Sequence, residues 1–290
     1  MGIKTEDKTI EGIFQQIDYG IDFYQREYKW NDKTQEHKPV KSLLEDIFYR
    51  FNLEYNDNLS PNQANLGKFE WYYLNTYMTN EINGKKFIVD GQQRLTTLTL
   101  IHIKLYHLAI KYSLPDFLID SIKKSIYGST AFGVFYCMGF DDRKEAIENL
   151  FNNDLNNLPA NQFKSISEEN IYKNYIVISE FLEKELIENV KDIKNKVHFF
   201  ILYFRLKIYL VEIIIDKSKD VPMVFEVIND RGIPLEPYEV LKGKILGQID
   251  KSEIDEYLEI WDKQVNQLYK YNVDEFFSYY FRSKFADTTK

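Results

Sequence analysis

The sequence predicts an α+β protein with a small mixed sheet near the N-terminus and a large helical region packed on it. Three observations lead to this fold class. Asn83-Gly84 separates two runs of strand character, which predicts a hairpin with a tight turn. Apolar residues recur with helical spacing over most of the chain after residue 92. A β-branched run at 207–216 comes late and is expected to return to the sheet.

The composition bounds the class of protein. The chain has 290 residues, of which 44% are hydrophobic and 28% charged, as in a globular domain with a sizeable core. Its net charge of −8 argues against binding nucleic acid through bulk electrostatics, so any DNA contact must be local. The single cysteine, Cys137, excludes an internal disulfide framework and a cysteine metal cage. With no signal peptide or long apolar run in the sequence, we expect a cytoplasmic protein that contacts no membrane.

The first 112 residues are expected to form the α/β core. The predicted elements are a helix at 9–17, a short extended piece within 21–30, a helix at 41–53, a polar loop at 56–68, strands at 69–80 and 86–90, and a helix at 92–112. Residues 113–290 are expected to be mostly helical. The elements predicted there are helices within 115–206, most clearly at 170–190, the strand at 207–216, a helix from about Pro222 to Gly232, a helix opened by Pro237, and an aromatic helix at 273–290.

The junction between the strand at 86–90 and the helix at 92–112 carries five residues that suit neither a core nor a simple loop. They are Asp90, Gly91, Gln92, Gln93 and Arg94. Gly91 can take a positive φ or bring its backbone close to a ligand. The helix that begins here has unpaired amides and the positive end of its dipole at this end, which favour an anion. Arg94 adds a guanidinium fork suited to phosphate, so the sequence predicts an anion site.

Neighbouring side chains have the chemistry to complete such a site. Asp90 can hold a divalent cation or a sugar hydroxyl. Gln92 and Gln93 can hydrogen-bond a base or orient a water molecule. Thr96 and Thr97, in the first helical turn, can donate to a phosphate oxygen. The sequence contains no GxxxxGK[ST] motif, so this is not a Walker-type loop.

A structural alternative needs no ligand at this junction. Asp90 would cap the helix, and Arg94 would be its ion-pair partner four residues further on. The spacing is compatible with both interpretations.

The segment FYQREYKW, residues 23–30, places aromatic rings beside a guanidinium. The side chains concerned are Tyr24, Gln25, Arg26, Tyr28 and Trp30. Such a group can stack on a base or line an apolar pocket with a polar rim. The alternative is a surface segment whose aromatic side chains lie half in the core.

A third segment, residues 225–246, carries Asn229-Asp230-Arg231-Gly232 between two predicted helices. Asn229 and Arg231 at this corner can reach a phosphate. The spacing by itself favours an ordinary connection between two helices, in which these polar residues only form the turn.

The histidines and the cysteine predict no second centre. His102 lies in the apolar stripe of its helix and is expected to be a packed core residue. His37, His107 and His198 have no metal-ligand or nuclease spacing. Cys137 has no base close in sequence and is expected to be inert.

Taken in order, FYQREYKW, IVDGQQRLTTL and FEVINDRGIPLEPYEVLK resemble the successive signature segments of the DGQQR-domain family. This family provides the N-terminal module of GmrSD-like modification-dependent restriction enzymes, and it occurs in SspE-like proteins that sense phosphorothioate DNA. Each segment by itself is a weak signal, but the three in this order and spacing are specific. The resemblance extends over residues 10 to 250.

The resemblance implies a ParB/sulfiredoxin-like core that binds and hydrolyses a nucleoside triphosphate, with Mg²⁺ as the expected ion. The candidate catalytic residues are Asp90, Gln92, Gln93 and Arg94, with Asp90 also the candidate metal ligand. The candidate nucleotide-binding residues are Gly91, Thr96, Thr97, Gln25, Arg26, Asn229 and Arg231. The candidate pocket for a DNA modification consists of Tyr24, Tyr28 and Trp30.

We therefore expect a nucleotide-hydrolysing regulatory or sensor module of an anti-phage restriction protein that gates a nuclease carried elsewhere. In the family a C-terminal HNH-type nuclease domain does the cutting, and residues 1–290 contain none. The sequence is thus expected to be a fragment, or to act with a nuclease subunit. One alternative is a non-hydrolysing module that recognises modified DNA, such as phosphorothioate or glucosylated DNA. Another is a ParB-like nuclease that nicks DNA. The expected partners are a nucleoside triphosphate, DNA, a nuclease domain or subunit and, in a homo-oligomer, further copies of the chain.

Overall fold

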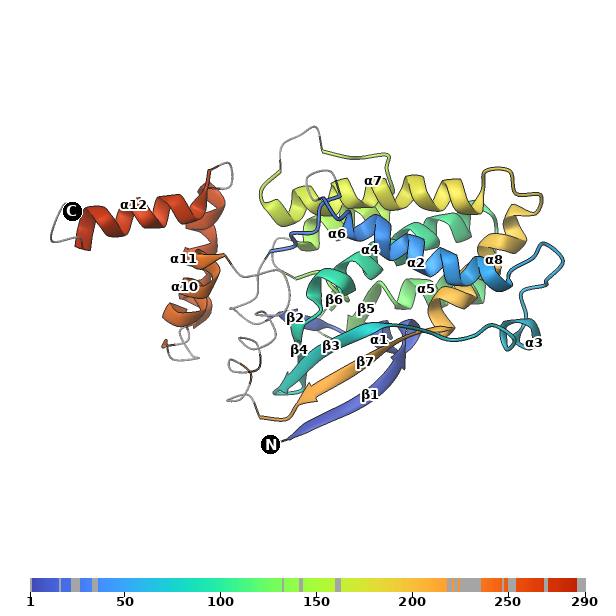
Figure 1. Cartoon of the computed structure of the whole chain (residues 1–290), viewed down its shortest axis with the longest axis horizontal. Coiled ribbons are helices and arrows are strands. Elements are labelled where there is room, and N and C mark those ends of the chain that lie inside the picture. The colour runs from blue at the N-terminus through green and yellow to red at the C-terminus, as the bar shows by residue number, and fades with distance from the viewer. Residues whose placement is uncertain are drawn as a thin grey trace.

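The computed structural model of the chain describes residues 2–15, 17–21, 27–32, 36–131, 133–140, 143–159, 163–217, 221, 224, 236–246, 248–249, 254–268 and 271–285. The protein is mixed α+β, as the sequence predicts, with a layer of helices over one face of a sheet (Figure 1).

The main sheet has five strands that come from distant parts of the chain. They are β1 (Ile3–Thr9), β2 (Tyr19–Ile21), β3 (Tyr72–Ile82), β4 (Lys85–Asp90) and β7 (Ile208–Ile215). Their order across the sheet is β1-β7-β3-β4-β2. β7 pairs antiparallel with β1 and parallel with β3, while β4 pairs antiparallel with β3 and parallel with β2. The late β-branched run therefore lies inside the sheet, between two strands of the N-terminal half.

The hairpin between β3 and β4 turns at Asn83-Gly84, as the sequence predicts. Asn83 has φ 53° and Gly84 has φ 78°. Two consecutive residues with positive φ are the signature of the tight hairpin turns that match strand twist.

Four helices, α5 to α8, pack on the long helix α4. The described helices are α1 (Ile10–Phe14), α2 (Pro39–Glu54), α3 (Gln63–Leu66), α4 (Gln92–Lys111), α5 (Asp116–Lys124), α6 (Lys144–Asn153), α7 (Ile166–Leu186), α8 (Ile193–Leu206), α10 (Pro237–Leu246), α11 (Ile254–Gln267) and α12 (Val273–Phe285). The sequence predicts α4 to be amphipathic with one apolar stripe. Instead α4 is buried on nearly every side, because α5, α6, α7 and α8 all pack on it.

The core of the fold crosses the predicted boundary at residue 112. One contiguous cluster of buried apolar residues includes Leu44 of α2, Leu98 of α4, Ile178 of α7 and Leu210 of β7. Residues on both sides of position 112, up to Leu210, thus contribute to one core. On the other face of the sheet, Val89 and Ile215 form a small separate cluster with Val221.

His102 of α4 is a core histidine, as the sequence predicts. Its ring is fully buried, its Nδ1 lies 2.9 Å from the carbonyl of Leu98, and it meets Phe14 and Phe204 edge-on. Burial, with a smaller contribution from the nearby charge of Arg205, lowers the pKa of His102 to about 3. Cys137 is also buried, and burial raises the pKa of its thiol to about 12.

β7 brings a charged residue, Glu212, into the sheet. Its carboxylate is fully buried and lies 2.6 Å from Nζ of Lys8 and 2.8 Å from Nζ of Lys86. Thr79 donates a further hydrogen bond of 2.6 Å. Burial acts to raise the pKa of Glu212, but these hydrogen bonds outweigh burial and lower it.

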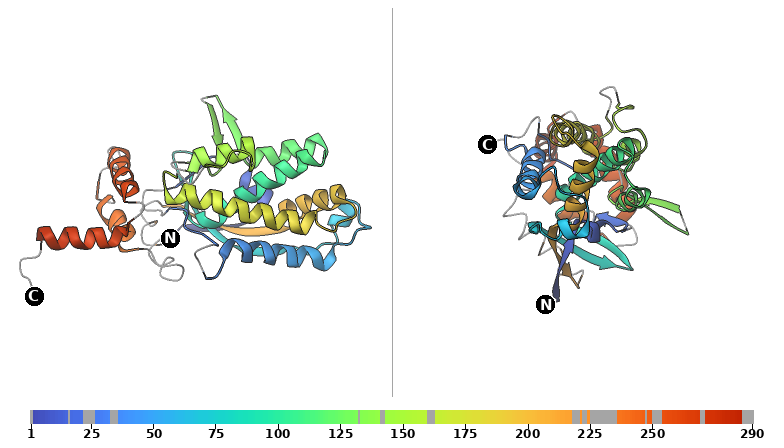
Figure 2. Two further views of the ribbon diagram at one scale, coloured as in Figure 1. Left: turned by 90° about the horizontal axis from the view of Figure 1, so that it is seen from above. Right: turned by 90° about the vertical axis from the view of Figure 1, so that its right-hand side faces the viewer.

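The strands β1, β5 and β6 were not predicted from the sequence. β1 has the sequence IKTEDKT and is largely exposed, because it forms the edge of the sheet and, among the described strands, has a paired strand, β7, on one side only. Its charges, which hide any alternating pattern, are typical of edge strands that resist aggregation. β5 (Tyr127–Thr130) and β6 (Gly133–Tyr136) form a hairpin that projects from the helical region (Figure 2). These strands are too short for a periodicity signal.

The C-terminal helices α10, α11 and α12 gather at one end of the molecule (Figures 1 and 2). α10 begins at Pro237, as predicted, while most of the predicted helix from Pro222 to Gly232 lies outside the described residues. None of the described helices combines the length and apolar character needed to cross a bilayer.

Candidate functional site

β4 passes directly into α4 through Gly91, and the backbone there requires glycine. Gly91 has φ 93° and is the N-cap residue of α4, so no side chain caps the helix. A Cβ atom on Gly91 would lie 2.8 Å from the Cβ of Tyr77 on β3, closer than real Cβ contacts allow. Because the capping residue is Gly91, the interpretation of Asp90 as the helix cap is wrong.

Asp90 and Arg94 flank this turn, and both are half-buried. Nη1 of Arg94 donates a 2.9 Å hydrogen bond to the carbonyl of Thr76 on β3. Burial lowers the pKa of Arg94, while the charge of Asp90 acts in the opposite direction. Within the described part of the chain, no ion pair of 4.0 Å or less joins the two side chains, and the carboxylate of Asp90 accepts no hydrogen bond. The predicted ion pair between Asp90 and Arg94 is therefore wrong.

The side chain of Gln93 binds the backbone of segment 27–30. Its Oε1 accepts hydrogen bonds from the amides of Lys29 (2.7 Å) and Trp30 (3.2 Å). Its Nε2 donates to the carbonyl of Glu27 at 2.7 Å. The first two segments singled out in the sequence thus meet in space, and Gln93 is the residue that joins them.

Gln92 and Thr96 are held by a residue outside the three segments, Arg143. Its guanidinium is 1% exposed and donates from Nη2 to Oε1 of Gln92 and from Nη1 to Oγ1 of Thr96, both at 2.9 Å. A buried arginine therefore fixes the side chains on one side of the first turn of α4.

The hydroxyls of Thr96 and Thr97 are enclosed in the protein. Both side chains are fully buried. Oγ1 of Thr97 donates to the carbonyl of Gln93 (2.9 Å) and lies 2.8 Å from the hydroxyl of Tyr28. In this conformation the two threonines support the turn, and their contact with phosphate stays a prediction.

Polar side chains of α7 also hydrogen-bond to the backbone of segment 27–30. The amide of Tyr28 donates to Oγ of Ser167 (3.0 Å), and Asn170 and Asn174 donate to the carbonyls of Tyr28 (2.8 Å) and Trp30 (2.6 Å). The ring of Tyr28 is fully buried and that of Trp30 is half-buried against the core. This agrees with the structural alternative for the segment, in which its aromatic side chains pack into the core.

The third segment contacts segment 27–30 through α10. Nζ of Lys29 lies 2.8 Å from Oε1 of Glu239 and 5.4 Å from the centre of the Tyr238 ring. The described parts of all three segments therefore form one connected structure. Five predicted site residues lie outside the described residues, namely Tyr24, Gln25, Arg26, Asn229 and Arg231.

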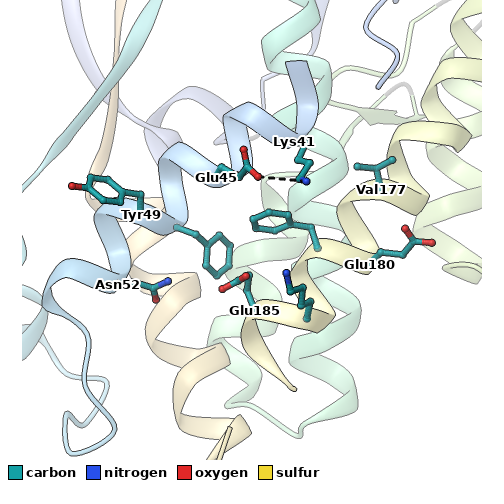
Figure 3. Close-up of a pocket in the computed structure, with 10 residues that line it drawn as sticks. Lys41, Glu45, Tyr49, Asn52, Val177, Glu180 and Glu185 are labelled. Carbon is teal, nitrogen blue, oxygen red and sulfur yellow. Dashed lines mark ion pairs between the residues drawn. The ribbon is translucent and has the colours of Figure 1, made fainter. Parts of the chain in front are cut away.

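A pocket of about 440 Å³ lies elsewhere, between α2 and α7 (Figure 3). It has an apolar floor that includes Phe48 and Phe181, and a rim of both charges that includes Lys41 and Glu180. None of the predicted site residues lines it, so it is separate from the turn at Asp90–Arg94.

Asp90 is the carboxylate that the turn from Asp90 to Arg94 offers to a metal ion. Among the described residues, no group of three or more His, Cys, Asp or Glu side chains gathers in a way that could hold one. Mg²⁺ is usually bound through one or two carboxylates, with substrate phosphates and water as its other ligands. Asp90 fits that arrangement, in which the substrate supplies part of the coordination.

Sequence reasoning missed Arg143 and the polar residues of α7. Arg143 follows two aspartates in a run that resembles an exposed loop, and nothing local marks it as buried. Ser167, Asn170 and Asn174 carried a signal, because their spacing of three and four residues forms a polar stripe on a helix assigned by its apolar stripe alone.

The fold and the site define the class of protein: an α+β module in which a strand enters a helix through an uncapped glycine turn bearing an aspartate and an arginine. The family model described as "GmrSD restriction endonuclease, N-terminal domain" matches residues 10–246, and the chain belongs to that family. A search of the curated proteins found no match.

Proposed function

We propose that the Asp90–Arg94 turn binds the phosphates of a nucleoside triphosphate and that its hydrolysis regulates a nuclease of a DNA restriction system. The observation that carries the proposal is the uncapped start of α4 at Gly91, with Arg94 beside it. The family supports the restriction context. The expectation of nucleotide turnover comes from the resemblance of the motif.

The electrostatics of the turn favour an anion. The first amides of a helix have no partner within the helix and carry the positive end of the dipole. Gly91 supplies no side chain that could satisfy them, whereas a Ser, Thr or Asp cap would. Arg94 adds a full positive charge on a guanidinium that Thr76 holds through one nitrogen.

The side chains divide into groups that face the ligand and groups that hold the turn. Arg94 would counter the charge that develops on the phosphates during transfer. Asp90 would hold Mg²⁺ together with the phosphates, and the ion would supply further charge neutralisation. Gln92 and Gln93 are bonded to Arg143 and to segment 27–30, so we assign them to positioning rather than to water activation.

Hydrolysis of the four common nucleoside triphosphates with Mg²⁺ tests the proposal. We expect turnover by the wild type, and a loss of roughly 10²- to 10³-fold in kcat for Arg94→Ala, the range seen when a single group that stabilises transition-state charge is removed. Arg94→Lys keeps the positive charge but loses the planar guanidinium fork. Its kcat is expected to lie between those of the wild type and Arg94→Ala.

Arg50→Ala is the matched control, because Arg50 is an exposed arginine on α2 that belongs to none of the three segments. It is expected to hydrolyse nucleotide like the wild type. Equal rates for the wild type, Arg94→Ala and Arg50→Ala would contradict the assignment of the site.

A further inference from the structure

Lys29 is held at two points that belong to different parts of the molecule. Its backbone amide donates to Gln93, in the first turn of α4. Its ammonium pairs with Glu239 of α10 at 2.8 Å. One residue therefore connects the proposed phosphate-binding turn with the C-terminal helices.

The acceptor of this ion pair is itself part of the start of α10. The side chain of Glu239 is only 4% exposed. Its other oxygen, Oε2, accepts a 2.8 Å hydrogen bond from the amide of Glu236, which is the reciprocal half of a capping box. Glu239 thus holds Lys29 with one oxygen and the first turn of α10 with the other.

α10 in turn is tied to the two helices that follow it. The amide of Tyr238 donates to Oδ1 of Asp274 in the first turn of α12 at 2.7 Å. Lys242 of α10 pairs with Asp262 of α11 at 2.8 Å. α10 is therefore bonded to both α11 and α12.

Lys29 is a positive charge among several carboxylates at the start of α10, so its effect extends beyond its ion pair with Glu239. The carboxylates of Glu239 and Asp274 both lie close enough to Glu236 to interact with it. Burial and the charges of Asp274 and Glu239 raise the pKa of Glu236, and Lys29 opposes this shift. Removing Lys29 would leave the carboxylates to repel one another at the start of α10.

We propose that Lys29 and Glu239 form a latch that holds helices α10–α12 against the phosphate-binding turn, and that occupancy of the turn strengthens the latch. The coupling rests on the proposed function. A ligand that rigidifies the first turn of α4 also rigidifies Gln93 and the backbone of Lys29, so the ammonium loses less freedom when it pairs with Glu239. By thermodynamic linkage, breaking the latch weakens the ligand by the same factor.

Hydrogen exchange measured by mass spectrometry tests the latch without any ligand. In the ligand-free protein, Lys29→Ala and Glu239→Gln are expected to raise exchange of residues 237–246 and 273–285 roughly 10- to 100-fold, since each leaves a desolvated charge or carboxylate cluster uncompensated. Lys41→Ala is the matched control, because Lys41 pairs with Glu45 on the exposed surface of α2 at 3.6 Å. Unchanged exchange of both segments in Lys29→Ala would overturn the latch.

The coupling is tested by adding the β,γ-imido analogues of adenosine and guanosine triphosphate with Mg²⁺. In the wild type we expect protection of residues 92–97 and also of 237–246, and in Lys29→Ala protection of 92–97 alone, with an affinity at least about 5-fold weaker. Protection of 92–97 alone in the wild type would overturn the coupling and leave the proposed function standing. Protection of neither segment by either analogue would refute the proposed function and the coupling together, while the ligand-free comparison still decides the latch.

Discussion

Replacing Gly91 with alanine separates the two demands that the turn between β4 and α4 makes on its backbone. The first demand is conformational, because Gly91 has φ 93°. An L-residue with a side chain in the left-handed region loses about 1–2 kcal/mol. The second demand is space, because the new Cβ would lie 2.8 Å from the Cβ and 3.3 Å from the Cα of Tyr77.

The spatial demand cannot be relieved by the rotation of a neighbouring side chain. The atoms in the way belong to the backbone and Cβ of a paired strand, so they cannot swing aside as the end of a long side chain can. Forcing one extra carbon into a packed site costs about 1–3 kcal/mol. We therefore expect Gly91→Ala to lower the free energy of unfolding by about 2–5 kcal/mol in total.

Gly84→Ala is the matched control, since Gly84 has φ 78° but no atom within 4 Å of the place that a Cβ would take. It has the conformational cost alone, about 1–2 kcal/mol. Urea unfolding followed by circular dichroism compares the two variants with the wild type. Equal losses for Gly91→Ala and Gly84→Ala would refute the inference that the turn presses against β3.

Three further predictions follow from buried groups. Gln93→Ala is expected to lower the free energy of unfolding by about 3 kcal/mol, at about 1 kcal/mol for each of its three hydrogen bonds to segment 27–30, whereas the exposed Gln63→Ala should change it little; urea unfolding checks both. His102, whose pKa burial lowers to about 3, is expected to show no titration of its imidazole NMR signals between pH 8 and pH 5, and a midpoint near the ordinary value of 6.5 would contradict its burial. The pKa of Glu212 is lowered on folding, so its contribution to stability is present above the unfolded value of 4.5 and is lost as the pH falls through the folded value. Glu212→Gln should therefore lose less stability than the wild type between pH 5 and pH 3 in the same unfolding assay, and an unchanged slope would count against the buried ion pairs.

Much of the local structure was predictable because neighbouring residues decide it. Asn83-Gly84 has few alternatives to a tight hairpin turn, and the helix from Gln92 to Lys111 follows from its apolar spacing. Gly91 was expected to take a positive φ or to bring its backbone close to a ligand, and it has φ 93°. By contrast, β1 was not predicted, because it lies at the exposed edge of the sheet and its charged residues hide any alternating pattern.

The roles of the side chains in the first turn of α4 could not be predicted in the same way. Gln92, Gln93, Thr96 and Thr97 were expected to face a ligand, but each is buried and hydrogen-bonded to the protein. Their orientation depends on Arg143 and on segment 27–30, which come from distant parts of the chain. A polar residue at the start of a helix has the same local signal whether it points to a ligand or into the fold.

The sequence by itself determined that this chain is an α+β protein with a strand–glycine–helix junction, and its three motifs in order indicated the family that residues 10–246 match. Only the tertiary structure decided that the described parts of these motifs meet. Gln93 binds a backbone 64 positions earlier in the chain, and Lys29 joins that backbone to α10. Turns and helices are set by the preferences of adjacent residues, whereas such contacts exist only once the core has brought distant segments together.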